Sequence, residues 1–289
     1  MKAPDFDYAK PRTLDDVYAL LAEYGDEARL LAGGQTLMAT LNMRLSEPAL
    51  LIDITGLAAL QGIAVQDGML RIGALATHTQ IESSALVAQH APLLAMAAPH
   101  IAHRAIRNLG TLGGSIAYAD PAAEWPTCAL ALDATVICCG AGGNRRIPAA
   151  EFFLDLYTTA LLPGELVLAC DFPLAARGAR FHFDELARRH GDYAIAGLAL
   201  ASQFDQGVMR QARIALLGIA STPVRARRTE ALLEGRALDA GAIGEAASLL
   251  AEELDGALAP MADLTNSSAT KRHLATVLLR RALATFMAG

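Results

Sequence analysis

Hydrophobic positions along the first part of the chain alternate between helical spacing and short continuous runs. Residues 14–24 carry apolar side chains three and four positions apart after Thr13, a good helix N-cap, which predicts a helix. Residues 28–31 and 49–54 are short apolar runs typical of buried strands, and a further helix is expected between them. The pattern predicts a first unit of strands and helices over residues 1–56.

The periodicity changes beyond this unit. The stretch "GIAVQDGMLRIGAL" predicts two short strands joined at Asp67 and Gly68, a hairpin signal. Helical segments are expected up to residue 103 and again over residues 122–132, followed by the strand "TVICC". These elements predict a second, mixed unit over residues 57–176, which ends in a linker bounded by proline and glycine.

The last part of the chain begins with strands and ends with helices. The runs "ARFHFDELARR", "AIAGLALASQF" and "ARIALLGIA" indicate strands of an antiparallel sheet. Helices are expected from Pro223, which suits a first helical turn, and over residues 244–253 and 271–287. The third unit is therefore predicted to be an α+β domain over residues 177–289, and the whole chain belongs to the α+β class.

Composition and charge narrow the class of protein. The chain has 289 residues, of which 53% are hydrophobic and 19% charged, so it is a globular protein with an ample core. A net charge of −6 argues against a nucleic-acid partner. The most basic cluster, Arg225, Arg227 and Arg228, is expected to form a solvated helix face.

Targeting signals and cysteines indicate the compartment. Residues 83–103 contain no charged side chain, but prolines and histidines interrupt them, so a membrane-spanning helix is not expected. The first residues lack the pattern of a secretory signal, which favours the cytoplasm. No cysteine belongs to a C-x-x-C pair, and Cys138 and Cys139 should point to opposite faces of a strand. We expect free, buried thiols in a reducing compartment.

A glycine pair ends the second predicted strand, in the stretch "LLAGGQTLMATLNMR". Gly33 and Gly34 can adopt backbone angles closed to other residues and allow a ligand to approach the backbone closely. Gln35 and Thr36 would then lie at the start of a helix, where free N–H groups suit a phosphate. The motif matches neither G-x-G-x-x-G nor a P-loop, and by itself it is more typical of a tight turn.

A second glycine motif, "GTLGGSIAYADPAAE", makes a binding site the better interpretation. Two backbone cradles followed by a carboxylate suit a long ligand with two phosphates and a ribose diol. Asp120 and Glu124 are the candidate carboxylates, although Asp120 before Pro121 also fits a helix cap.

These motifs, with the blocks "LLIDI", "RIGALATH", "LLPGELV", "ARRHGDYAIAG" and "STPVRA", cover essentially the whole chain. In this order and spacing the chain resembles the flavin-binding medium subunits of molybdenum-containing hydroxylases, which include the carbon monoxide dehydrogenase medium subunit and the xanthine dehydrogenase FAD domain. The resemblance implies a two-subdomain FAD-binding fold of the vanillyl-alcohol-oxidase (PCMH) type, followed by a C-terminal domain of antiparallel sheet with helices.

The resemblance also assigns cofactor contacts by position. It implies non-covalent FAD, with the pyrophosphate at the first motif, the isoalloxazine ring beside residues 101–102, and the adenosine ribose on Glu124 rather than Asp120. Leu162 would pack near the adenine or the ring edge, and Tyr193 would border the flavin. The implied FAD contacts are Ala32, Gly33, Gly34, Gln35, Thr36, Leu37, Ile101, Ala102, Gly110, Thr111, Gly114, Ser115, Glu124, Leu162 and Tyr193.

Two positions bear on how the flavin would be held: the place of a lysine that relatives often carry, and His78. Relatives often carry a lysine shortly before the paired arginines, where this chain has Asp184 and Glu185, so a cationic partner of the flavin is missing or is supplied by Arg188. His78 follows Thr77, and flavoproteins of the wider fold sometimes tether flavin through a histidine. The resemblance to non-covalent binders makes a tether the minor alternative.

The function implied by the resemblance is electron transfer in a heteromeric complex. Electrons would pass from [2Fe-2S] clusters of a small partner subunit through FAD to an external acceptor, and hydroxylation would occur on a molybdenum cofactor in a large subunit. A dimer of such three-subunit protomers is expected, with no catalytic acid or base and no metal ligand in this chain. The alternatives are a stand-alone flavin-dependent oxidase or reductase, and an assembly protein with an empty flavin site.

Overall fold

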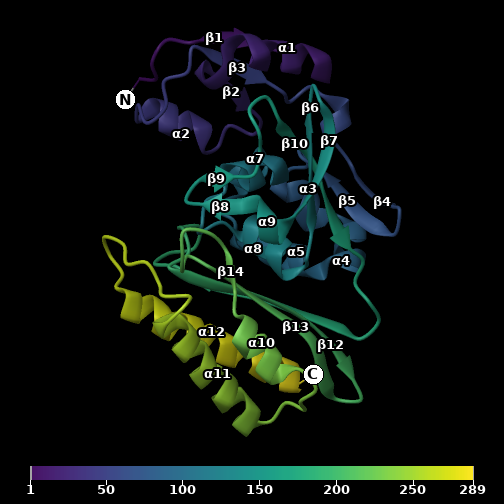
Figure 1. Ribbon diagram of the computed structural model, residues 1–289, viewed down its shortest axis with the longest axis vertical. Coiled ribbons are helices and arrows are strands. Elements are labelled where there is room, and N and C mark those ends of the chain that lie inside the picture. Colours follow the sequence, from purple (N-terminus) through teal and green to yellow (C-terminus); the bar gives the residue numbers. More distant parts are fainter. Residues whose placement is uncertain (1, 289) are drawn as a thin grey trace.

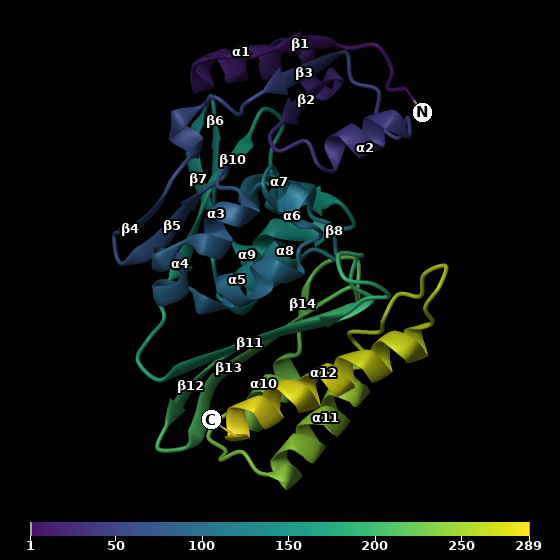
Figure 2. The same ribbon diagram turned by 180° about the vertical axis from the view of Figure 1, so that it is seen from behind.

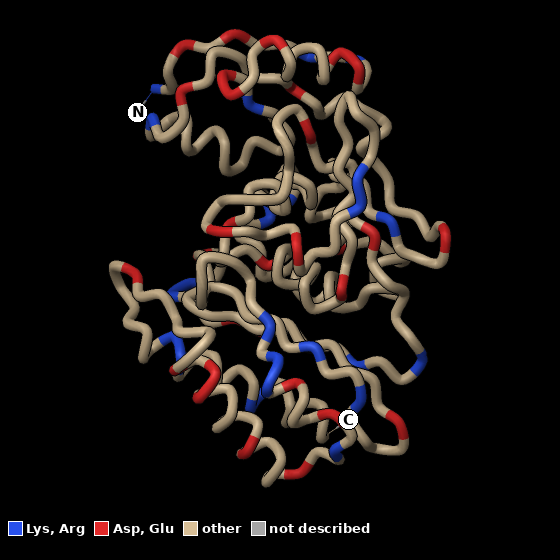
Figure 3. The backbone as a smooth tube through the Cα atoms, viewed as in Figure 1, with Lys and Arg blue, Asp and Glu red and all other residues tan. Residues whose placement is uncertain are grey.

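The computed structural model describes residues 2–288 and stacks three units along its long axis (Figure 1). The N-terminal strands lie at one end, a larger sheet with helices occupies the middle, and the C-terminal sheet with its helices forms the other end. Acidic and basic residues are spread over all three units without a face of one sign in this view (Figure 3).

The N-terminal unit is built on a small parallel sheet. Its strand order is β1-β3-β2, and Leu30 of β2 pairs with Ile52 of β3. Thr13 caps α1 in a capping box with Asp16, which confirms the predicted helix start. The elements are β1 (Asp7–Ala9), α1 (Leu14–Tyr24), β2 (Ala28–Leu31), α2 (Leu37–Asn42) and β3 (Leu50–Asp53).

The middle unit contains a five-stranded antiparallel sheet in the order β4-β5-β10-β6-β7. The predicted hairpin at Asp67 and Gly68 is confirmed as β4 and β5, and Cys138 and Cys139 of β6 point into different cores. The strands are β4 (Ile63–Gln66), β5 (Met69–Gly73), β6 (Thr135–Gly140), β7 (Gly143–Pro148) and β10 (Leu166–Pro173). A separate two-stranded sheet is formed by β8 (Phe153–Asp155) and β9 (Thr158–Thr159).

Short helices pack on the middle sheet and fill its core with small apolar residues. Proline opens α5 at Pro92, so the uncharged stretch at residues 83–103 is broken into separate turns rather than one helix. The helices are α3 (His78–Ser83), α4 (Ala85–His90), α5 (Pro92–Ala97), α6 (Arg104–Arg107), α7 (Leu112–Tyr118), α8 (Glu124–Ala131) and α9 (Ala149–Phe152). No helix among residues 2–288 is long and apolar enough to cross a membrane.

The C-terminal unit is a four-stranded antiparallel sheet, β11-β12-β13-β14, with long helices on one face (Figure 2). Even-numbered residues of β12 pack on these helices, whereas Ala199 and Ala201 join the core of the middle unit. The elements are β11 (Ala179–Leu186), β12 (Ala196–Asp205), β13 (Val208–Leu217), β14 (Val224–Arg225), α10 (Arg227–Leu233), α11 (Ala240–Asp255) and α12 (Ser268–Ala288). Alternation along each strand thus lets one sheet serve two cores.

Two expectations from the sequence are wrong. Pro223 does not open a helix, because β14 intervenes and α10 begins at Arg227. Arg225 is not on a solvated face: its guanidinium is buried in a bidentate pair with Glu230 and also contacts Asp133 at 3.0 Å. A buried arginine needs such carboxylate partners, and Asp133, which follows α8 in the middle unit, comes from far along the sequence.

Candidate functional site

The first glycine motif forms an open loop between β2 and α2. Gly34 has a φ of +69°, in the left-handed region that favours glycine. Among the described residues, none of the backbone N–H groups of residues 33–37 donates a hydrogen bond to another backbone group. The Gln35 side chain instead turns back to donate to the Gly33 carbonyl at 2.9 Å. Five consecutive free donors are unusual in a half-buried loop, since such groups are normally paired.

The second glycine motif is a closed turn that leads into α7, a helix that the sequence analysis missed. Thr111 caps this helix by accepting from the Gly114 N–H at 3.1 Å. The Leu112 and Gly113 N–H groups donate to the carbonyls of Ala76 and Ala74. The N–H groups of Gly110, Gly114 and Ser115 also donate within the protein, so this loop uses its donors internally, and in it only Gly114 is exposed.

The two loops touch each other through backbone atoms. A Cβ placed on Gly33 would lie 2.1 Å from the Leu109 carbonyl oxygen, and one on Gly114 would lie 4.0 Å from the Ala32 methyl group. The motifs are some 80 positions apart in sequence, so only the fold brings them together. Gly33 is needed here for close approach between loops.

His78 supports the second loop from below. Its backbone N–H donates to the Gly110 carbonyl at 2.9 Å, and its Nδ1 accepts from the Trp125 indole N–H at 2.8 Å. Burial lowers the pKa of His78 to about 4, with the charge of Arg107 as the second cause. A buried, neutral histidine already engaged with Trp125 fits a structural role.

The segment that contains Ile101 and Ala102 is shaped by one arginine. Arg107 Nη1 donates to the Ile101 carbonyl at 3.1 Å and to the Ala102 carbonyl at 3.3 Å, and its Nε pairs with Glu82 at 3.0 Å. Ala102 has a φ of +42°, which costs about 1–2 kcal/mol for an L-residue outside glycine. Strain held by a buried arginine is typical of a functional segment.

Acidic and tyrosine side chains gather near the start of α8. Asp120 accepts from the Ala122 N–H at 2.9 Å, which uses one of its oxygens in a local turn. Glu124 is the first residue of α8 and is half-buried; burial raises its pKa to about 7, helped by Asp120. Tyr118 lies against Tyr157 with a centroid separation of 5.1 Å. Glu124 thus has carboxylate oxygens to offer a ligand, whereas Asp120 is partly engaged.

The remaining predicted residues lie in loops. Tyr193, between β11 and β12, is 70% exposed as a whole residue; partial desolvation of its hydroxyl group and the nearby Asp120 raise its pKa. Leu162 follows β9 and is exposed; its N–H donates to Glu165 at 2.8 Å. Gly218 donates to the Pro121 carbonyl at 2.8 Å, which fixes the C-terminal sheet against the segment that carries Glu124. The structure thus connects Tyr193 to the acidic group, whereas Leu162 is joined to Glu165 instead.

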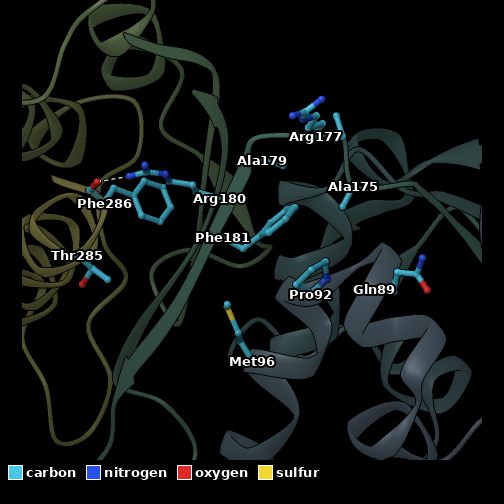
Figure 4. A pocket seen from close by; sticks show the side chains of 11 residues that line it. Gln89, Pro92, Met96, Ala175, Arg177, Ala179, Arg180, Phe181, Thr285 and Phe286 are labelled. Atoms are coloured by element: carbon cyan, nitrogen blue, oxygen red, sulfur yellow. Dashed lines mark hydrogen bonds between the residues drawn. The ribbon is translucent and has the colours of Figure 1, made fainter. Parts of the chain in front are cut away.

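A separate groove of about 600 Å³ lies between α4, α5 and the end of α12 (Figure 4). Met96, Phe181 and Phe286 form its apolar lining, and Arg177 and Arg180 add positive charge. None of the glycine-loop residues lines it. Among residues 2–288 no group of three or more His, Cys, Asp or Glu side chains could hold a metal ion.

Sequence reasoning missed several residues that shape the site. Arg107, Trp125 and Tyr118 act through carbonyls and rings that only the fold brings near. The one available signal was their position within or beside the second motif, in the stretch "RNLGTLGGSIAYADPAAEW".

Comparison with known proteins places this geometry in one class. Residues 4–175 match the family model "FAD binding domain in molybdopterin dehydrogenase", and residues 181–286 match "CO dehydrogenase flavoprotein C-terminal domain". The chain therefore belongs to the family of FAD-binding medium subunits of molybdopterin dehydrogenases, the family of the carbon monoxide dehydrogenase medium chain. This confirms the resemblance, the α+β fold with its antiparallel C-terminal sheet, and the class of oxidoreductase flavoprotein subunit.

Individual relatives match over nearly their full length. The 6-hydroxypseudooxynicotine dehydrogenase complex subunit alpha of Paenarthrobacter nicotinovorans is 40% identical over 98% of this chain and 95% of its own. The carbon monoxide dehydrogenase medium chain of Hydrogenophaga pseudoflava is 34% identical over 98% of this chain and 97% of its own. A solved structure of the carbon monoxide dehydrogenase from that organism superimposes with a TM-score of 0.95 at 35% identity, covering 100% of this chain and 99% of that one.

Proposed function

We propose that this chain binds FAD non-covalently between its two glycine loops and carries electrons from [2Fe-2S] clusters of a partner subunit to an external acceptor. Family membership supports the cofactor class, and relatives whose names describe subunits of dehydrogenase complexes support a heteromeric setting. The observation that carries the proposal is the row of free backbone N–H groups at residues 33–37, beside the second glycine loop.

The residues present fit an FAD pyrophosphate. Successive backbone N–H groups that point into one concavity bind anions well, and glycine leaves room for a phosphate to approach the backbone. The open loop has these free donors, and the second loop, exposed at Gly114, adds a second wall. We assign the pyrophosphate to residues 32–37 and its other side to Gly110, Thr111, Gly114 and Ser115.

Other residues would hold the rest of the cofactor. Glu124 would accept hydrogen bonds from the adenosine ribose, and Leu162 would pack at the adenine or ring edge. Residues 101–102, fixed by Arg107, would line the isoalloxazine ring, and Tyr193 would cover it. Bound FAD supplies the redox chemistry, so this chain binds and orients it and needs no catalytic acid or base.

The partners follow from the direction of electron flow. We propose a small [2Fe-2S] subunit and a large subunit with the molybdenum cofactor, arranged as a dimer of heterotrimers. Exposed apolar side chains border the glycine loops, among them Leu109 (58% exposed) and Met38, and they are candidates for coverage by a partner. Arg188 and Arg189 add positive charge in the loop that precedes Tyr193. Four buried, unpaired cysteines suit a reducing compartment such as the cytoplasm.

The test is to purify the chain alone and together with the products of its neighbouring genes. The expected result is a yellow protein whose flavin is released by acid and identified as FAD, and which co-purifies with iron–sulfur and molybdenum subunits. Flavin that remains on the chain after acid would indicate a covalent bond. A lone chain that turns over an organic substrate would replace this proposal with a stand-alone flavin oxidase, and a colourless complex would indicate an assembly role.

A further inference from the structure

A buried carboxyl group lies beside the proposed FAD site and has no place in the function described above. Glu185 is on β11, and its side chain is only 6% exposed. Its Oε2 atom is buried and has no hydrogen-bond partner among the described residues. An ionised carboxylate in such a place is costly unless it is paired, so this atom needs either a ligand or a proton.

The sheet geometry fixes the direction of this side chain. Glu185 pairs with Gly197 across β11 and β12, and Gly197 pairs in turn with Leu217, whose side chain packs in the core of the middle unit. Glu185 therefore faces the middle unit, where Glu124 lies. Asp184 points to the other face, where it pairs with Arg281 at 3.6 Å.

No lysine or arginine among residues 2–288 compensates Glu185. Within 4.0 Å of its carboxylate the described residues place no lysine or arginine, and only His100 Nδ1, at 3.9 Å from Oε1, comes near. Burial lowers the pKa of His100, and burial together with Glu124 raises the pKa of Glu185 to about 8, so both groups favour their neutral forms. The titratable and charged groups around Glu185 are His100, Glu124 and Cys128 from the middle unit, and His182, Asp184, Arg188, Arg189, His190 and Asp192 from its own strand and loop.

We propose that Glu185 holds a proton in the FAD-bound protein and that loss of this proton weakens FAD binding. The inference rests on the proposed function, because it takes Glu124 as a contact of the cofactor. Neutral Glu185 leaves one negative charge at this wall of the site, whereas ionised Glu185 adds a second beside Glu124 and a pyrophosphate dianion. Like charges at a poorly solvated site repel strongly, so the anionic ligand and the proton should bind together.

The expected dependence of affinity on pH has a definite sign. The free protein loses the Glu185 proton as pH rises through about 8, while the FAD complex retains it to higher pH. Above that point the dissociation constant of FAD should rise about tenfold per pH unit until the complex also loses the proton. Below pH 7 this group should leave the affinity unchanged.

The experiment measures FAD binding to the full-length apoprotein by quenching of FAD fluorescence from pH 6 to pH 9.5. Wild type should lose affinity by about fivefold between pH 8 and pH 9, because the group is already half ionised at pH 8. Glu185→Gln, which copies the neutral carboxyl group in shape, should bind FAD at pH 6.5 like wild type and should lack the loss of affinity that wild type shows above pH 8. An identical pH profile in the two proteins would overturn the proposal.

A second measurement needs no variant and so remains decisive if Glu185→Gln does not fold. Titration calorimetry of the wild type with FAD at pH 8.5, in two buffers of different ionisation enthalpy, should show uptake of a proton on binding. Absence of proton exchange would contradict the proposal. Failure of the proposed function would look different, because FAD would then not bind the chain or its complex at any pH.

Discussion

The two glycine motifs look alike in sequence but use their backbone N–H groups in opposite ways in the structure. The first, at residues 33–37, is half-buried and keeps its backbone donors free. The second, at residues 110–114, is mostly buried and uses its donors to bind α7 and the preceding loop to the middle sheet. The first loop therefore has donors available for the ligand that we propose, whereas the second loop packs against the first and supports it.

The comparison teaches that a glycine pair alone does not indicate a cradle. Gly113 is glycine because Ala74 leaves no room for a Cβ, and Gly110 because the His78 ring lies below it. Gly34 is glycine because of its positive φ, and Gly33 because the Leu109 carbonyl is in the way. Gly33 does not have the positive φ that the sequence pattern suggested, so a larger side chain there would act by collision with the second loop.

The largest effect is expected on stability, from a substitution at Gly113 in the second glycine loop. In Gly113→Ala the new Cβ would lie 2.4 Å from the Ala74 Cβ and 2.8 Å from its backbone, and overpacking of this kind typically costs about 1–3 kcal/mol or more. The melting temperature of the apoprotein should fall by several degrees. Gly244→Ala in α11, where the added Cβ meets nothing within 4 Å, is the matched control and should not lower it. Equal melting temperatures for both variants would show that the second glycine loop is not tightly packed at Gly113.

The second largest effect is expected on FAD binding, where a substitution at Gly33 should push the two glycine loops apart without unfolding the protein. In Gly33→Ala the Cβ would approach the Leu109 oxygen to 2.1 Å, so the first loop must move away from the second. We expect the FAD content to fall at least tenfold while the circular dichroism of the protein stays near that of wild type. Gly34→Ala is the companion variant in the same loop. The Leu31 and Met38 side chains near its added Cβ can yield, so its cost is backbone strain from the positive φ, at about 1–2 kcal/mol. A Gly33→Ala protein with full FAD would mean that contact between the loops does not shape the site.

The carboxylates at the far end of the second motif allow a finer test. Loss of charge-assisted hydrogen bonds to a ribose costs about 1.5–3 kcal/mol, or roughly ten- to a hundredfold in affinity, so Glu124→Ala should weaken FAD by that factor. Asp120→Ala should change the affinity less, since Asp120 already accepts from Ala122. The reverse order, measured by equilibrium titration with FAD, would move the ribose contact to Asp120.

The smallest effect is expected on how the stability of the protein depends on pH, through His78, which packs under the second glycine loop. His78 has a pKa lowered from 6.5 to about 4, so it adds stability that is present above pH 6.5 and is lost as pH falls toward 4. Replacing His78 by Asn should lower stability at pH 7 and flatten the decline of the melting temperature between pH 6.5 and pH 4. A His78→Asn protein with the same slope as wild type would show that this histidine does not govern the acid response.

Much of the fold could be predicted because its local signals agree. The N-cap at Thr13, the Asp67-Gly68 hairpin and the strand in "AIAGLALASQF" each appear in a few neighbouring residues and each is confirmed. The helix α7 was missed because its sequence, "LGGSIAY", contains two glycines and looks like a loop. Contacts with Ala74 and Ala76 stabilise it, and these contacts are tertiary.

Motifs and periodicity, which can be read along the chain, were enough to predict the family, most of the elements and the candidate residues of the FAD site. Three features could be seen only in the folded chain: which glycine loop keeps its donors free, the burial of Arg225 against Glu230, and the place of Glu185 facing the middle unit with no lysine or arginine of residues 2–288 within 4.0 Å. The physical reason is that hydrogen-bond pairing, close approach and the electrostatic environment of a charge depend on which distant residues lie nearby, and that is settled by folding alone.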